Sequence, residues 1–368
     1  MAECIASLFP EAEIFTLLSS PAGLPDGVLN RRLHNSFLQK IPLATEYHRH
    51  MMPLYASAVK SLDLKGFDLV ISSDSGPVKG VQIDPGAIHL CYCHSPMRYL
   101  YDGYETYRSQ MKGMTRALFT VFASSLREWD RSAGKRVTAF IANSNYVADR
   151  IRRVYGRDSM VIHPPIDLHL ARLASPGSHY LCAGRLVGYK RTELMLEACK
   201  RLGRPLRIAG AGPEEATLRR LAAGADVEFL GELSTEELWQ QYAVCRALIF
   251  AADEDFGMVP LEVQACGRPV IAYGVGGSLE TVRGYKGSGS NEPPTGVYFS
   301  EQTVESVMEG IQQFERLDAE GVFQADAIHR WAEGFRTEVF LDRMRQYILS
   351  VIPEAELAMS SGPEVVRG

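Results

Sequence analysis

The feature that most constrains the fold is a regular alternation of short apolar runs and amphipathic segments along the 368-residue chain. The runs are six to eight residues long, rich in β-branched or aromatic residues, and each is followed by a turn or a helix start. This alternation predicts parallel sheets wrapped by helices, an α/β fold. The expected strands are 13–18, 67–74, 87–94 and 138–144 in the first half, and 179–184, 206–212, 227–232, 247–253, 269–274 and 295–300 in the second.

A loose connection divides the chain near its middle. Residues 161–180 read VIHPPIDLHLARLASPGSHY, in which two consecutive prolines stop a helix and Ser, Pro and Gly follow. We therefore expect two doubly wound, Rossmann-like domains that face each other across a cleft, where the carboxyl ends of the strands bind ligands. The predicted parts are domains 1–163 and 164–335, a helix at 336–355 that could cross back to the first domain, and a disordered tail at 356–368.

Composition excludes several classes of protein. The formal net charge is -5, from 39 Lys and Arg against 44 Asp and Glu, which argues against a nucleic-acid partner. Seven cysteines without a CxxC pair predict reduced thiols rather than a zinc site. The apolar runs are too short to span a bilayer, and the acidic start is unlike a signal peptide, so we expect a cytoplasmic protein.

The stretch EDFGMVPLE, residues 254–262, joins an apolar run to the next helix. Glu254 is expected at the mouth of the cleft, and Glu262 on a helix that begins there. The backbone N–H groups of Gly257, Met258 and Val259 would be the unpaired donors of that helix start, which suit anions and hydroxyls. For either glutamate alone, a helix cap or a solvated helix residue is the alternative.

These residues carry a resemblance to a known family. The two glutamates, the following ACGRPVI (265–271) and the GGSLE loop (276–280) resemble the donor half of retaining glycosyltransferases of the GT-B fold, family four. AGRLVGYKR (183–191) resembles the loop of that family in which an Arg and a Lys hold the diphosphate of a nucleotide sugar, here Arg185 and Lys190. Segments of the first half look most like bacterial mannosyltransferases of O-antigen or exopolysaccharide assembly.

The resemblance implies roles for the donor-side residues. Arg185 and Lys190 would stabilise the charge of the departing diphosphate. Glu262 would accept hydrogen bonds from the ribose hydroxyls, and Glu254 would contact the transferred sugar. The glycine turn at Gly210 would line the donor, and Glu232 and Leu233 would lie nearest the base. No D-x-D pair is placed to hold a metal, so metal-independent transfer without a cofactor is expected.

The first half offers three further candidates. His94 ends an expected strand and is followed by Ser-Pro. The resemblance places it near the sugar and the acceptor, where it could bond the O6 of the sugar or polarise the acceptor hydroxyl; a histidine that caps the next helix is the alternative. Tyr99 and Asp102 could line the acceptor side, and Asp102 could equally be an N-cap.

The start of the chain departs from the family pattern. Family members usually begin with a strand and a Gly-Gly loop, whereas MAECIASLFPEAEIF is expected to be the helix after that loop and then the second strand. That first strand is central in the sheet, so its absence would expose two inner edges and places activity in doubt. We expect the true start to lie upstream.

One more segment is ambiguous. Residues 111–136 mix basic residues with Phe119, Phe122 and Trp129 at helical spacing. Such a helix could lie on an anionic membrane, where a lipid-linked acceptor would wait, or it could be a core-facing helix with solvated cations.

The resemblance predicts transfer of mannose from GDP-mannose to a saccharide or lipid-linked acceptor in polysaccharide or lipopolysaccharide synthesis. Transfer from a UDP-sugar and a non-catalytic nucleotide-sugar-binding protein are the alternatives. A dinucleotide dehydrogenase is disfavoured, because GAGPEE holds only the first two glycines of G-x-G-x-x-G.

Overall fold

The computed structural model describes residues 1–20, 24–287, 292–357 and 359, and divides them between two compact units. The first unit is Met1–Pro164 with Phe340–Gly368, and the second is Pro165–Val339. The predicted boundary lay between residues 163 and 164. Most of the predicted disordered tail, 356–368, lies outside the described residues.

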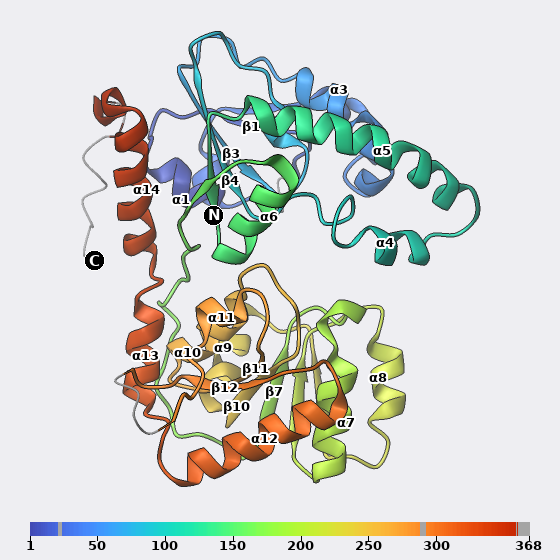
Figure 1. The fold of residues 1–368 in the computed structure, drawn as a ribbon, viewed down its shortest axis with the longest axis vertical. Helices are drawn as coiled ribbons and strands as arrows, with labels where there is room; N and C mark the ends of the chain where they lie inside the picture. The colour runs from blue at the N-terminus through green and yellow to red at the C-terminus, as the bar shows by residue number, and fades with distance from the viewer. Residues whose placement is uncertain (21–23, 288–291, 358, 360–368) are drawn as a thin grey trace. The chain divides into compact units, whose positions relative to one another are not determined.

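The described residues of the second unit form one sheet of six parallel strands, which helices surround (Figure 1). Its strand order is β12-β11-β10-β7-β8-β9, which is the doubly wound arrangement that the sequence predicted. All six strands lie inside runs predicted from sequence. They are β7 Tyr180–Ala183, β8 Leu206–Ala209, β9 Val227–Gly231, β10 Ala247–Phe250, β11 Val270–Tyr273 and β12 Gly296–Phe299.

Helices cover both faces of this sheet. One core contains apolar residues of α7, α8 and α12, and a second core contains those of α9, α10 and α13. The predicted capping box is present at α9, where Ser234 and Glu237 bond each other's backbone N–H groups. The helices are α7 Thr192–Leu202, α8 Glu215–Leu221, α9 Thr235–Val244, α10 Met258–Ala265, α11 Ser278–Thr281, α12 Val304–Ala319 and α13 Ala325–Glu333, with a 3-10 turn η5 at Gly188–Lys190.

The first unit holds two separate parallel sheets among its described residues. One pairs β1 (Ile14–Thr16) with β2 (Leu33–Asn35), and the other has the order β3-β4-β5-β6. A single continuous sheet is therefore not formed by these strands. The second sheet consists of β3 Leu69–Asp74, β4 Ile88–Cys93, β5 Ala139–Ala142 and β6 Ser159–Val161.

The four-stranded sheet is covered by helices from both ends of the chain. α1 (Ala2–Ser7) and α14 (Thr337–Val351) pack on one face, where Phe340, Met344 and Ile348 enter the core. α6 packs on the other face; Ser144 caps its start, and Gly156, at φ 65°, ends it. The remaining elements are α2 Asp26–Leu29, η2 Phe37–Lys40, η3 His48–Leu54, α3 Tyr55–Lys60, η4 Val78–Gly80, α4 Tyr104–Gln110, α5 Gly113–Arg136, α6 Asn145–Tyr155 and η6 Pro353–Leu357.

Candidate functional site

The strand order of the second unit places the candidate residues together. From β7 the chain continues to β8 and β9 on one side, and β10 to β12 lie on the other side, so the order reverses between β7 and β10. In open parallel sheets, ligands bind at the carboxyl ends of the strands at such a reversal. Arg185 and Lys190 follow β7, and Glu254 follows β10. The predicted cations and the first glutamate therefore lie at the point where a ligand is expected.

Lys190 and Glu254 form an ion pair across this point. The exposed fractions of their side chains are 15% and 19%, so the pair is largely enclosed but still reaches solvent. The Lys190 ammonium also lies 5.7 Å from the centre of the Phe250 ring, at the end of β10. Because the pair is partly exposed to solvent, an incoming anion could replace the Glu254 carboxylate as the partner of the Lys190 ammonium.

Arg185 differs from Lys190 in its exposure and in its partners. Its side chain is exposed, and it makes no hydrogen bond or ion pair with any part of the chain that the structure describes. An exposed guanidinium and an enclosed ammonium, both in the segment after β7, offer one bidentate donor and one point charge to a diphosphate. The two predicted cations therefore differ in how much protein surrounds them.

The start of α10 lies in the same loop as Glu254. Gly257 precedes the helix with φ 90°, a conformation that favours glycine, and provides no side-chain cap. The N–H groups of Met258 and Val259 open the helix and carry its partial positive charge. These are the donors that the sequence predicted for an anionic or hydroxyl ligand.

Glu262 lies one turn further along α10 and is half-buried. The Tyr242 hydroxyl, from α9, donates to Glu262 Oε2 at 3.1 Å. Burial raises the pKa of Glu262, and the tyrosine hydrogen bond opposes that shift. The hydrogen bond holds the carboxylate in one orientation and leaves acceptor capacity on the other oxygen. The sequence offered no signal for Tyr242, which lies 20 residues away on another helix.

The glycine turn at Gly210 has a packing role. A Cβ on Gly210 would lie 2.1 Å from the carbonyl oxygen of Gly184, and one on Gly212 would lie 2.3 Å from that of Leu186. The loops after β7 and β8 therefore interlock backbone against backbone. The same occurs between the loops after β10 and β11, where a Cβ on Gly277 would lie 2.2 Å from Phe256 Cα. These contacts fix the loops that carry Arg185, Lys190 and Glu254.

Glu232 and Leu233 follow β9, the outermost strand on one side of the sheet. Glu232 is exposed, and Leu233 packs partly into the core around α9. A role toward the nucleotide base stays a prediction for both.

In the first unit, His94 follows β4 and is tied to neighbouring strands. Its Nε2 lies 2.8 Å from Ser73 Oγ on β3, and its carbonyl accepts from Asn143 at 3.0 Å. The His94 ring also packs edge-on against the Tyr92 ring, with a distance of 5.2 Å between the ring centroids. These bonds attach His94 to β3 and to Asn143, the residue after β5, and the helix-cap alternative stays a prediction. Its role toward the sugar and the acceptor stays a prediction.

The other two candidates of the first unit have internal partners. The Tyr99 hydroxyl contacts Met97 Sδ at 3.0 Å, and burial raises the pKa of Tyr99. Asp102 pairs with Arg150 Nε at 2.7 Å, and only 1% of the Arg150 side chain is exposed. Asp102 thus neutralises a buried guanidinium. It does not cap α4, whose N-cap is Gly103, so the N-cap alternative is wrong.

Domain models of two glycosyltransferase families match the chain in succession. "Glycosyltransferase Family 4" matches residues 12–170, and "Glycosyl transferases group 1" matches residues 174–329. Sucrose-phosphate synthase from Thermosynechococcus elongatus superposes with a TM-score of 0.71 at 20% identity, over 96% of this chain and 92% of the other. The chain has the GT-B fold, and its two halves are similar to these two glycosyltransferase domain models.

Curated relatives match parts of this GT-B chain. The O-antigen chain mannosyltransferase C of Escherichia coli is 32% identical over 121 residues, which are 31% of this chain and 33% of the relative. A GDP-mannose-dependent monoacylated alpha-(1-6)-phosphatidylinositol monomannoside mannosyltransferase of Corynebacterium glutamicum is 30% identical over 184 residues, 41% of this chain and 48% of the relative. The matches thus span a third to a half of the length of these relatives.

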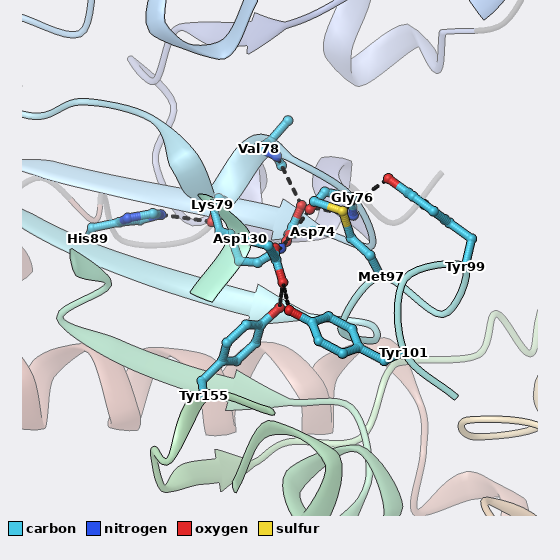
Figure 2. Close-up of polar contacts among 11 residues, drawn as sticks. Asp74, Gly76, Val78, Lys79, His89, Met97, Tyr99, Tyr101, Asp130 and Tyr155 are labelled. Carbon is cyan, nitrogen blue, oxygen red and sulfur yellow. Dashed lines mark hydrogen bonds and ion pairs between the residues drawn. The ribbon is translucent and has the colours of Figure 1, made fainter. Parts of the chain in front are cut away.

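Sequence reasoning missed a buried ionic cluster in the first GT-B domain (Figure 2). The Lys79 ammonium lies 2.8 Å from Asp74 Oδ2 at the end of β3 and 2.7 Å from Asp130 Oδ1 on α5, and all three side chains are fully buried. The hydroxyls of Tyr101 and Tyr155 converge on Asp130 Oδ2, at 2.8 and 2.9 Å. Burial raises the pKa of Asp74, although the Lys79 charge opposes that shift.

The described residues lack both a metal-binding cluster and a membrane-spanning helix. No group of three or more His, Cys, Asp or Glu residues there is arranged to hold a metal ion. None of the helices described is both long enough and apolar enough to cross a bilayer. All seven cysteines are free, and six of them are buried.

Proposed function

We propose that this chain transfers a mannosyl residue from GDP-mannose to a saccharide or lipid-linked saccharide acceptor, with retention of configuration. The observation that carries the proposal is the meeting of Arg185, Lys190 and Glu254 where the strand order reverses between β7 and β10. Two cations at that point suit a diphosphate, and the matched domain models are those of glycosyltransferases. The GDP-mannose-dependent relative supports the choice of donor.

The proposed chemistry assigns a distinct task to each group. The donor diphosphate displaces Glu254 from Lys190 and also binds Arg185 and the N–H groups at the start of α10. Glu262, held by Tyr242, accepts hydrogen bonds from the ribose hydroxyls. Glu254, once released, faces the transferred sugar and stabilises positive charge at its anomeric carbon.

In the transfer step, the bond between the anomeric carbon and the diphosphate oxygen breaks, and a bond to the acceptor oxygen forms on the same face. The acceptor hydroxyl gives its proton to the departing phosphate oxygen. Lys190 and Arg185 neutralise the charge that this oxygen gains, so we propose that the step needs no metal ion. We further propose that the reaction takes place in the cytoplasm and serves synthesis of a cell-surface polysaccharide.

A ligand panel tests the proposal. Thermal shift and calorimetry with GDP-mannose, UDP-glucose, UDP-GlcNAc and NAD should show preference for GDP-mannose in the wild type and its loss in Glu262→Ala. An equal response to EDTA-treated and magnesium-supplemented samples is expected. Preference for UDP-glucose would mean that the donor is a UDP-sugar and not GDP-mannose. Binding of GDP-mannose without release of GDP in the presence of saccharide acceptors would favour a non-catalytic binding protein.

A further inference from the structure

Arg191, the residue that follows Lys190, has an unusual backbone conformation. Its φ and ψ are 56° and 34°, in the left-handed region that residues other than glycine rarely adopt. Among the residues that the structure describes, Leu43 is the only other non-glycine residue with a positive φ. Such a conformation persists only where the surrounding structure enforces it, so the neighbours of Arg191 show what it achieves.

The segment before Arg191 is fixed to the loop after β8. The Leu186 N–H donates to the carbonyl of Ala211 at 3.0 Å. The chain then makes the 3-10 turn η5, in which the Lys190 N–H donates to the carbonyl of Val187 at 3.0 Å. Lys190 is the last residue of this turn, so its position depends on how the turn joins the helix that follows.

The segment after Arg191 is fixed by the core of the domain. Thr192, the first residue of α7, is buried, and Met195 and Leu196 enter the core within the next turn. Arg191 is the N-cap of this helix, yet its side chain makes no capping hydrogen bond. N-cap residues normally have an extended backbone and cap the helix with a side-chain oxygen. The helix start therefore gives no reason for the left-handed conformation.

The position of Lys190 does give a reason. Its ammonium lies over the end of β7, since a Cβ on Gly184 would be 3.8 Å from Lys190 Nζ, and it pairs with Glu254 after β10. Because α7 and the segment up to Leu186 are both fixed, the φ angle of Arg191 sets the direction in which the turn presents Lys190. A negative φ at residue 191 would rotate the turn about the N–Cα bond and move the ammonium relative to Glu254.

We infer that Arg191 is a positioning residue of the donor site, and that it acts through its backbone and not through its guanidinium. The left-handed conformation holds the Lys190 ammonium against Glu254 before any ligand binds, so the diphosphate meets a cation that is already in place. The Arg191 side chain is itself 47% exposed and lies 3.5 Å from Glu193. The inference rests on the proposed function only in that Lys190 binds the donor diphosphate.

The donor affinity of backbone variants tests the inference. Arg191→Gly and Arg191→Val both remove the guanidinium, but glycine accepts the left-handed conformation freely, whereas β-branched valine disfavours it. In calorimetry with GDP-mannose, Arg191→Gly should bind within about twofold of the wild type, and Arg191→Val about tenfold more weakly. Leu43→Gly and Leu43→Val make the matched backbone change in the first domain, and both should bind like the wild type.

A double variant shows whether the effect passes through Lys190. Arg191→Val should weaken binding when Lys190 is present but have no further effect in Lys190→Ala, because the cation that it misplaces is then absent. Arg191→Thr is the second variant if Arg191→Val does not fold, since threonine can cap α7 from an extended backbone. Denaturant unfolding checks that each variant is folded under the conditions of the binding assay.

The inference is overturned if Arg191→Gly loses as much affinity as Arg191→Val, because the guanidinium would then bind the ligand itself. It is also overturned if Arg191→Val binds like the wild type, or weakens binding equally with and without Lys190. A wild-type chain that binds no nucleotide sugar would contradict the proposed function alone. Crystal structures would then decide the inference: the pair of Lys190 and Glu254 should remain in Arg191→Gly and be broken in Arg191→Val, and a pair that remains in both would overturn it.

Discussion

The two domains each place a lysine against a carboxylate near the carboxyl ends of parallel strands, but the two sites differ in their access to solvent. Lys79 is fully buried between Asp74 and Asp130, whereas Lys190 and Glu254 retain exposed fractions of 15% and 19%. A fully buried charge has no route to a ligand and serves to hold elements together. A lysine that still reaches solvent can exchange its carboxylate for a phosphate. Residual exposure, more than residue type, therefore distinguishes the proposed ligand site from the buried cluster.

The largest expected effect is a loss of unfolding free energy when Lys79 is removed from the buried cluster. Its absence would contradict the structural role given to that cluster. Lys79→Met leaves Asp74 and Asp130 buried without their cation, which should cost about 3–5 kcal/mol of unfolding free energy. Denaturant unfolding measures it, with Lys65→Met at an exposed lysine as the control. Equal stability of the two variants would mean that the buried cluster does not hold the first domain together.

A second test of the buried region uses acid. Burial, followed by the charges of Arg136 and Lys79, lowers the pKa of His89 to about 4, from the usual histidine value of about 6.5. The unfolded chain therefore takes up this proton before the folded chain does, so stability is lost as pH falls from 6.5 to 4. The loss should approach about 3 kcal/mol. His89→Gln should reduce the slope of unfolding free energy against pH in that range, and His169→Gln, at an exposed histidine, should not.

The third prediction concerns the solvent-accessible pair. Lys190→Ala should weaken binding of the donor nucleotide roughly tenfold to a hundredfold, because a charge-assisted contact to the diphosphate is lost. The cost in stability should be only about 1 kcal/mol, since Glu254 still reaches water. Calorimetry and denaturant unfolding measure the two quantities. Lys200→Ala, at a lysine that donates to the carbonyl of Leu221 on α8, serves as the control.

A reversed pattern, with Lys190→Ala unfolding the domain but leaving nucleotide affinity intact, would assign the pair a structural role and remove the distinction between the two sites.

The smallest expected effect is on the pH dependence of donor affinity, which tests the role of Glu262. Glu262 has a raised pKa and must be ionised to accept ribose hydroxyls, so donor affinity should fall as pH drops through that pKa. Tyr242→Phe removes the bond that opposes the shift, so the fall should begin at higher pH, with no more than about a threefold change near neutrality. Calorimetry across pH checks both. An unchanged pH profile in Glu262→Gln would show that this carboxyl does not control affinity.

The strands that carry long apolar runs were predictable because buried parallel strands need continuous apolar residues. All six strands of the second domain fall inside the expected runs. The two missed strands, β2 and β6, are three residues long and hold no such run. They pair through backbone hydrogen bonds at the edges of their sheets, and such pairing needs no particular pattern of side chains.

Arg185, Lys190 and Glu254 could be placed from sequence because they lie in segments that follow strands, and parallel strands end at one edge. Partners that come from distant segments could not. Asp130 lies 51 positions from Lys79, and Arg150 lies 48 positions from Asp102. A charged residue is usually exposed, so its sequence alone favours a solvated position. A charged side chain can be buried only when the fold brings an opposite charge beside it, and the sequence does not show which distant residue provides that charge.

The helix α14 has a consequence for the order in which the chain can fold during synthesis. Phe340, Met344 and Ile348 complete a core that also contains residues from β3 to β5 of the first domain. That core cannot close until these last side chains have left the ribosome. The second domain, by contrast, is one continuous stretch, residues 165–339. The domain that is translated first is therefore finished last, and it depends meanwhile on protection from aggregation.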